Sequence, residues 1–95
     1  MSLRFEWDPK KAKTNLTKHN VSFEEALTVF ADPPARIFPD EEHSVDEIRE
    51  IIIGHSAQRG LLVVNFTGSD ERVRIFSARK ATNTERKDYE ENVGS

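Results

Sequence analysis

The chain has 95 residues, enough for one compact domain over residues 1–95 and too few for a separate regulatory module. It contains no cysteine, which excludes disulfides, thiolate catalysis and zinc fingers and fits a reducing cytoplasm. No apolar run approaches the roughly 20 residues that a membrane helix needs, and the start carries no leader-like apolar stretch, so we expect a soluble cytoplasmic protein.

Charge is unevenly distributed along the chain. The net charge of −3 argues by itself against a nucleic-acid partner, because Lys and Arg supply most of the affinity for phosphates. Residues 1–19, however, carry five basic and two acidic side chains, and residues 72–89 carry six basic and two acidic ones. Residues 20–50, by contrast, carry two basic and nine acidic side chains. Two basic ends around an acidic middle indicate one positive cleft and one negative surface, although a mixed solvated surface would give the same counts.

The chain begins with a predicted strand and helix. Residues 3–7 alternate apolar and polar side chains, the pattern of a half-buried strand. Asp8 can cap a helix that starts at Pro9, where the missing amide hydrogen costs nothing. We expect this helix to run to about His19 and to end at Asn20, since asparagine tolerates the left-handed conformation.

An amphipathic helix follows. Ser22 and Glu25 have the spacing of a capping box. Four apolar residues recur at helical spacing on one face, namely Phe23, Ala26, Leu27 and Phe30. The helix ends at Asp32–Pro34, because neither proline can continue the hydrogen-bond ladder.

The second half of the chain is predicted to form a sheet and a final helix. Four strands are expected, at residues 35–39, 46–53, 60–67 and 72–78. The run Leu61–Phe66 is apolar on both faces apart from Asn65, which places it centrally. Thr82 and Glu85 have capping-box spacing and open a polar helix through Asn92. The predicted fold class is therefore α+β, with an N-terminal strand and two helices packed on a largely antiparallel sheet and a C-terminal helix.

The strongest candidate for chemistry is a set of polar residues near the end of the chain. They are Arg72, Arg74, Arg79, Lys80, Arg86 and Tyr89. Arg72 and Arg74 share a strand face, and Arg86 and Tyr89 share a helix face. Guanidinium groups can hold phosphate, and the tyrosine ring can stack on an unpaired base. An edge strand blunted by charge, next to a solvated helix, would show the same pattern.

Histidines are candidates for proton transfer. His19 is in phase with Ala12 and Leu16 and should face inward, where it could shuttle a proton or close a polar contact under the next loop. His43 and His55 lie in segments that resemble solvated turns. No spacing matches a helical His pair or a facial triad, so we expect neither a metal nor another cofactor.

Arg59 precedes Gly60 at the mouth of a predicted hairpin. The glycine is explained by the turn. The arginine is either an ordinary turn residue or a phosphate ligand at the end of the sheet.

Several long segments, in order along nearly the whole chain, resemble the BrnT toxins. They are Phe5–Ala12, Lys18–Ala26, His43–Ser44, Arg59–Val64 and Arg74–Ala81. Two positions depart from the family pattern. Asn20 replaces a common glycine, and Phe76 replaces a usual aliphatic residue, a change that we expect to affect packing only.

The resemblance implies a fold similar to RelE-type ribonucleases and an endoribonuclease toxin that inhibits translation. It also implies a BrnA-like antitoxin with a DNA-binding ribbon-helix-helix, hence indirect contact with operator DNA, and no membrane partner. In the RelE-like scheme no metal is needed. A base removes the proton of the ribose 2′-hydroxyl, which attacks the adjacent phosphate and leaves a 2′,3′-cyclic product. His19 is the base candidate within a matching motif, with Glu85 as the alternative.

The resemblance also assigns roles to the remaining polar positions. Arg79 and Arg86 are expected to stabilise the charged phosphorane. Arg59 and Lys80 would hold the flanking backbone, and Tyr89 would stack or donate a hydrogen bond. The catalytic set is thus His19, Arg79, Arg86 and Tyr89, and the substrate-binding set is Arg59, Arg72, Arg74, Lys80 and Glu85. A different class of function stays open, in which the same surface is a non-catalytic module that docks a DNA-binding partner in a repressor complex.

Overall fold

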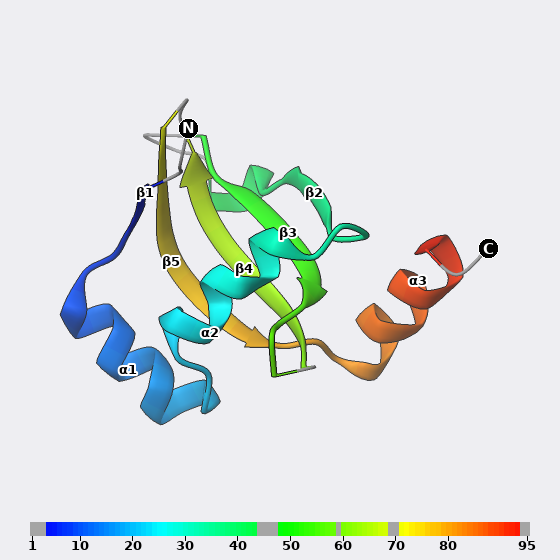
Figure 1. The fold of residues 1–95 in the computed structure, drawn as a ribbon, viewed down its shortest axis with the longest axis horizontal. Coiled ribbons are helices and arrows are strands. Elements are labelled where there is room, and N and C mark those ends of the chain that lie inside the picture. The colour runs from blue at the N-terminus through cyan, green and yellow to red at the C-terminus, as the bar shows by residue number, and fades with distance from the viewer. Residues whose placement is uncertain (1–3, 44–47, 59, 69–70, 94–95) are drawn as a thin grey trace.

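A computed structural model describes residues 4–43, 48–58, 60–68 and 71–93 (Figure 1). The helices and strands are β1 (Arg4–Glu6), α1 (Pro9–His19), α2 (Phe23–Thr28), β2 (Arg36–Pro39), β3 (Glu50–His55), β4 (Leu61–Gly68), β5 (Arg72–Lys80) and α3 (Asn83–Val93). Two short 3-10 helices, η1 (Val29–Ala31) and η2 (Glu41–His43), follow α2 and β2. The predicted α+β class and order of elements are confirmed.

The strands form one mixed sheet in the order β1-β5-β4-β3-β2. Strands β2, β3, β4 and β5 pair with one another in antiparallel fashion, while β1 pairs with β5 in parallel. The predicted central place of the apolar run is confirmed, since β4 lies in the middle. The strand expected at residues 46–53 differs in position. The observed strand, β3, spans Glu50–His55, and so it includes His55, a residue that we expected in a turn. Residues 44–47 lie outside the described part of the chain.

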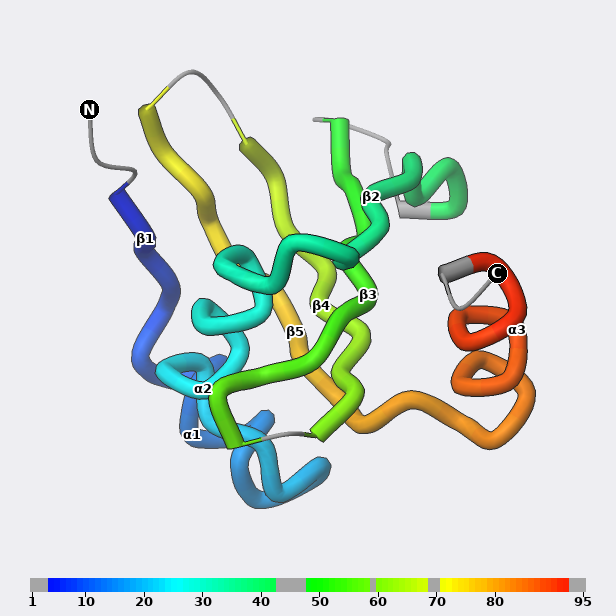
Figure 2. Tube along the Cα trace, turned by 45° about the vertical axis from the view of Figure 1, so that its right-hand side comes forward, coloured from blue at the N-terminus to red at the C-terminus, as the bar shows by residue number. Residues whose placement is uncertain are grey.

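The two faces of the sheet are covered differently. Helices α1 and α2 lie on one side, whereas α3 stands apart from them with the strands between (Figure 2). The larger core, on the α1 and α2 side, contains Val21, Phe23, Ala26, Val29, Ile52, Leu62, Val64, Phe66, Val73, Ile75 and Ala78. A smaller cluster on the opposite face joins Tyr89 of α3 to Ile53, Leu61 and Val63. Side-chain alternation along β3 and β4 accounts for the division, because successive residues point to opposite faces.

The predicted helix ends are confirmed. The Asp8 carboxylate accepts a hydrogen bond from the Lys10 amide at 2.9 Å, and Pro9 follows it at the first helical position. Asn20 has φ 56°, the left-handed conformation, and its amide donates to the Leu16 carbonyl at 2.9 Å.

Strand β5 contains a β-bulge that changes which of its side chains reach each face. In the register with β4, Ser77 lies opposite Asn65 and Ile75 opposite Phe66, so Phe76 is an extra residue. Val73 and Ile75 face the larger core before the bulge, and Ala78 faces it afterwards. Because of this shift, Ser77 and the residue two further on, Arg79, point to the α3 side.

Asn15 of α1 closes the free edge of β5. Strand β1 pairs with residues 72–74, and among the described residues no strand pairs with the backbone beyond them on that side. The Asn15 side chain is 6% exposed and bonds both backbone groups of Ala78, donating to the carbonyl at 2.8 Å and accepting from the amide at 3.1 Å. It also donates to the Val21 carbonyl at 2.9 Å. One side chain thus replaces part of a missing strand.

We predict that Asn15→Ala lowers the free energy of unfolding by about 2 kcal/mol or more, because it leaves buried backbone groups of Ala78 without partners. Urea unfolding followed by the emission of the single tryptophan, Trp7, measures this, since its ring packs against Phe23. Thr14→Ala is the matched control, being exposed on the same helix, and should change stability by about 0.5 kcal/mol or less. Equal stabilities for the two variants would contradict the role of Asn15.

Candidate functional site

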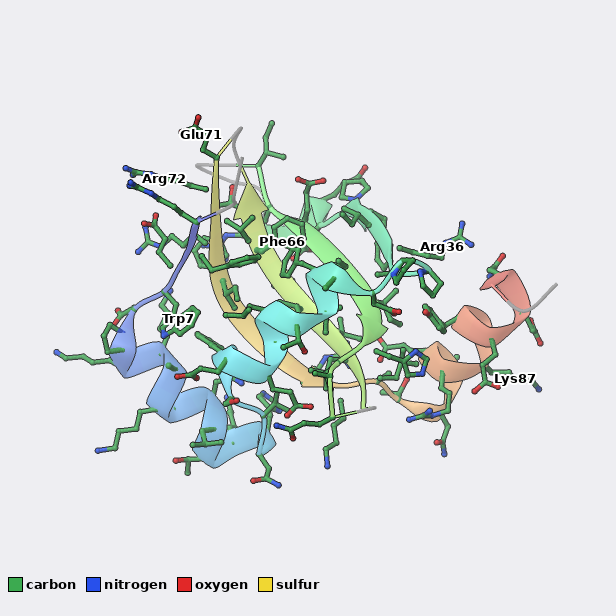
Figure 3. The ribbon with its side chains drawn as sticks, viewed as in Figure 1. Trp7, Arg36, Phe66, Glu71, Arg72 and Lys87 are labelled. Atoms are coloured by element: carbon green, nitrogen blue, oxygen red, sulfur yellow. The ribbon has the colours of Figure 1, made fainter. Side chains whose placement is uncertain are left out.

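A cleft of about 550 Å³ lies between the sheet and α3. Its floor is apolar and includes Ile51, Ile53 and Val63. The polar and charged residues around it are Arg36, Asp40, Glu42, Asn65, Arg79, Glu85, Asp88, Tyr89 and Asn92. Arg36 leaves β2 on the side nearer to α3 (Figure 3), and its Nη1 donates to the Asn92 carbonyl at 3.5 Å. Three predicted site residues, Arg79, Glu85 and Tyr89, therefore line the same cleft.

Arg79 and Glu85 form a bidentate ion pair across the start of α3. The two guanidinium nitrogens of Arg79 lie 2.7 and 2.8 Å from the two carboxylate oxygens of Glu85. Glu85 also completes the predicted capping box, because its carboxylate accepts from the Thr82 amide at 2.9 Å. The hydrogen bonds from Arg79 lower the pKa of Glu85 to about 2, and the same hydrogen bonding raises the pKa of Arg79.

Tyr89 anchors α3 to the far end of the sheet. Its side chain is only 5% exposed and packs on Ile53, Leu61 and Val63. Its hydroxyl donates to Oδ2 of Asp32 at 3.3 Å. Burial raises the pKa of Tyr89, and the neighbouring Asp32 charge adds to the effect.

Asp32 and His55 meet Tyr89, and sequence reasoning gave neither a role in the site. The His55 amide donates to Oδ2 of Asp32 at 2.8 Å, and the His55 ring packs edge-on against Tyr89 with centroids 5.4 Å apart. Gly54 permits this close approach, since a Cβ there would lie 2.7 Å from Ala35 Cβ and 2.9 Å from Asp32 Oδ2. The glycine before His55 was the available signal, but spacing alone does not reveal that Asp32, 23 residues before His55, is its partner.

A second hollow, the α1 groove, lies between α1 and β5. It is lined by Lys10, Lys11, Thr14, Asn15, Lys18, His19, Phe76 and Ser77, with no acidic residue among them. His19, another predicted site residue, is half-buried there rather than in the cleft. The two hollows adjoin, because Ser77 of the groove donates to Oδ1 of Asn65, a cleft residue, at 3.2 Å.

The remaining predicted residues are more dispersed. Arg72 and Arg74 are exposed near the start of β5, where Figure 3 shows Arg72 beside Glu71 and away from α3. Lys80 and Arg86 are also exposed, and neither lines the cleft or the α1 groove. Arg59 lies outside the described residues.

Two negative findings concern the described residues alone. In this part of the chain, no group of three histidine or carboxylate side chains is arranged to hold a metal ion. Nor does any helix within it have the length and apolar character needed to span a membrane.

The fold and the two hollows define a small α+β domain in which a C-terminal helix and a basic N-terminal helix flank a mixed sheet. Residues 7–85 match a family model described as the ribonuclease toxin, BrnT, of type II toxin-antitoxin systems. The chain therefore belongs to the BrnT family of ribonuclease toxins, as the sequence resemblance predicted.

A solved structure shares the fold. The crystal structure of the Brucella abortus ribonuclease toxin BrnT superposes with a TM-score of 0.66 at 24% sequence identity. The match covers 86% of this chain and 100% of that one. A search of curated proteins found no match.

We predict that Glu85→Gln lowers the free energy of unfolding at neutral pH by about 1 kcal/mol, a modest amount because both side chains of the ion pair are about a third exposed. The folded-state pKa of Glu85 is about 2 against an ordinary value of 4.5, so its stabilisation is complete above pH 4.5 and is lost as the pH falls toward 2. Urea unfolding at several pH values should show the difference from wild type shrinking over this interval. Glu90→Gln, on an exposed part of α3, is the control and should show no such trend.

Proposed function

We propose that this protein is a metal-independent endoribonuclease that inhibits translation by cutting RNA. The observation that carries the proposal, in a chain of the BrnT family, is the hydrogen bond between a residue of the cleft and a residue of the α1 groove, which makes the two hollows neighbours. Arg79 and Tyr89 line the cleft and His19 lines the groove, and the hydrogen bond joins Ser77 to Asn65.

The proposed reaction uses the ribose 2′-hydroxyl as nucleophile. A base takes its proton, the 2′-oxygen forms a bond to the adjacent phosphorus, and the bond from phosphorus to the 5′-oxygen breaks. The departing 5′-oxygen takes up a proton. The products are a 2′,3′-cyclic phosphate and a 5′-hydroxyl, so no oxidant or second substrate is required.

His19 is the proposed base. It lies in a groove with three lysines, which can hold the phosphate close to it. Glu85, the alternative base, is less suited, because a carboxylate with a pKa of about 2 has little affinity for a proton at neutral pH.

Arg79 is the proposed cation for the phosphorane, together with Arg86, an exposed residue of α3 that does not line the cleft in the free protein. Tyr89 is the proposed stacking or hydrogen-bonding residue, a role that requires RNA binding to uncover its ring, because the ring is 5% exposed and its hydroxyl donates to Asp32 in the free protein. In the free protein the Glu85 carboxylate accepts two hydrogen bonds from the Arg79 guanidinium, and this pairing keeps the guanidinium oriented toward the cleft. A phosphate entering the cleft would share or displace this carboxylate. We retain Lys80, Arg59, Arg72 and Arg74 as proposed contacts to flanking RNA.

The proposed protein partner is a BrnA-like ribbon-helix-helix antitoxin, through which the complex would contact operator DNA. Acidic side chains around the cleft, including Asp40, Glu42 and Asp88, suit a basic antitoxin segment. Such a segment lying over the apolar floor would block Arg79 and Tyr89 from RNA.

We predict that purified protein cuts RNA in the presence of EDTA and leaves 2′,3′-cyclic phosphate ends. His19→Gln should slow cleavage by about 10²-fold or more, because general-base assistance is lost. Denaturing gels with and without EDTA measure the cleavage, and mass spectrometry identifies the ends. RNA that stays intact with folded protein in large excess would contradict the proposed activity.

The same assay distinguishes a catalytic Arg79 from a structural one. Arg79→Ala should slow cleavage by about 10²-fold, since it removes a cation aimed at the developing charge. Glu85→Gln breaks the same ion pair but keeps that cation, so it should slow cleavage much less. Equal losses in the two variants would mean that Arg79 acts only by holding α3 in place.

We also predict that expression of the chain alone stops bacterial growth and that coexpression of a BrnA-like antitoxin restores it. Growth curves with and without induction test this prediction. A non-catalytic docking module would give the opposite pattern, with harmless expression and an effect of Arg79→Ala on complex formation rather than on growth.

A further inference from the structure

Phe76 lies at the centre of a cluster of positive charges. Its ring centroid is 4.1 Å from Cζ of Arg49, 5.3 Å from Nζ of Lys11 and 5.8 Å from Cζ of Arg74. These cations come from three places in the sequence. Lys11 belongs to α1, Arg49 is the residue before β3, and Arg74 belongs to β5. The sequence led us to expect only a packing effect from an aromatic residue at this position.

The backbone explains why this ring is presented at the surface. Phe76 is the extra residue of the β5 bulge, so its side chain does not follow the alternation of side chains between the two faces of the sheet. It is only partly buried and lines the α1 groove beside Ser77.

We propose that Phe76 is the base-stacking platform of an RNA subsite adjoining the catalytic cleft. An unpaired base stacks with the Phe76 ring, and the neighbouring phosphates contact Lys11 and the other lysines of the α1 groove. This inference rests on the proposed function and adds to it the place where the substrate strand is held outside the cleft.

Three observations support RNA as the occupant. An aromatic ring combined with a basic groove is the arrangement by which proteins hold single strands, because every base has a face that can stack and every linkage carries a negative charge. Among the described residues, the groove lining includes Lys10, Lys11 and Lys18 and no carboxylate, so this lining repels a basic partner and attracts a polyanion. The hydrogen bond from Ser77 to Asn65 places the groove directly beside the cleft.

Binding of a labelled short 2′-O-methyl oligoribonucleotide tests the subsite separately from catalysis. This probe cannot be cut by the proposed route, because its 2′-oxygen carries no proton. Fluorescence anisotropy should show that Phe76→Leu weakens binding by about tenfold, the loss expected for one stacked base. The matched control is Ile37→Ala, which removes an exposed apolar side chain of β2 that lines neither the cleft nor the α1 groove and should leave binding unchanged.

The dependence of affinity on salt separates stacking from charge. Phe76→Leu keeps every charge, so the slope of log affinity against log salt should match that of wild type. Lys11→Gln removes one phosphate contact and should make that slope shallower by about 0.7, the value for one contact to a single strand.

Phe76→Trp keeps a ring for stacking and provides a second readout that does not depend on a loss of affinity. Binding should persist, and saturation with the oligonucleotide should change the emission of the new tryptophan beyond any change in wild type, whose single tryptophan is Trp7. Wild type that fails to bind, Phe76→Leu that binds as well as wild type, or unchanged emission from Phe76→Trp would overturn the subsite. Binding with the expected losses but no RNA cleavage would contradict the proposed function and leave the subsite standing.

Discussion

The bulge at Phe76 is the constraint on which the candidate site depends. Val73 and Ile75 face the larger core, so an unbroken strand would send Ser77 and Arg79 to the same face. The extra residue reverses the alternation, and Ala78 takes the core position instead. As a result Arg79 reaches Glu85 in the cleft and Ser77 reaches Asn65. A single added residue thus converts two potential core positions into parts of one polar surface.

The helices on either side of this surface are held by few, specific polar contacts. On the α1 side, the Asn15 amide satisfies both backbone groups of Ala78, which fixes the edge that forms the groove. On the other side, α3 contributes Tyr89 to the smaller apolar cluster and gains its direction from the ion pair of Arg79 with Glu85. Because α3 is attached mainly at its first turns and at Tyr89, the shape of the cleft depends on polar contacts rather than on a large apolar interface.

The sequence predicted those features that arise from local chemistry. Capping signals located both ends of α1, and the apolar run of β4 located the centre of the sheet, because caps and periodicity act over a few neighbouring residues. The bulge could not be predicted, since it depends on the register between β4 and β5. The meeting of Asp32 with His55 was missed for a related reason, because Asp32 was fully explained as the residue before two prolines. The sequence could predict that Arg79, Glu85 and Tyr89 lie close together, because all three fall within a stretch of eleven residues.

The distribution of charge resolves the conflict between an acidic protein and an RNA substrate. The net charge of −3 is not spread evenly. In the part of the chain that the structure describes, the α1 groove is lined by basic and neutral side chains, whereas the cleft is lined by four carboxylates and two guanidinium groups. In the proposed function a polyanion therefore meets the groove first, and only its reacting phosphate enters the more acidic cleft, where Arg79 is already oriented. A basic protein segment has the opposite preference and favours the cleft. Adjacent surfaces of opposite character would thus let substrate and antitoxin compete at Arg79 while approaching it from different sides.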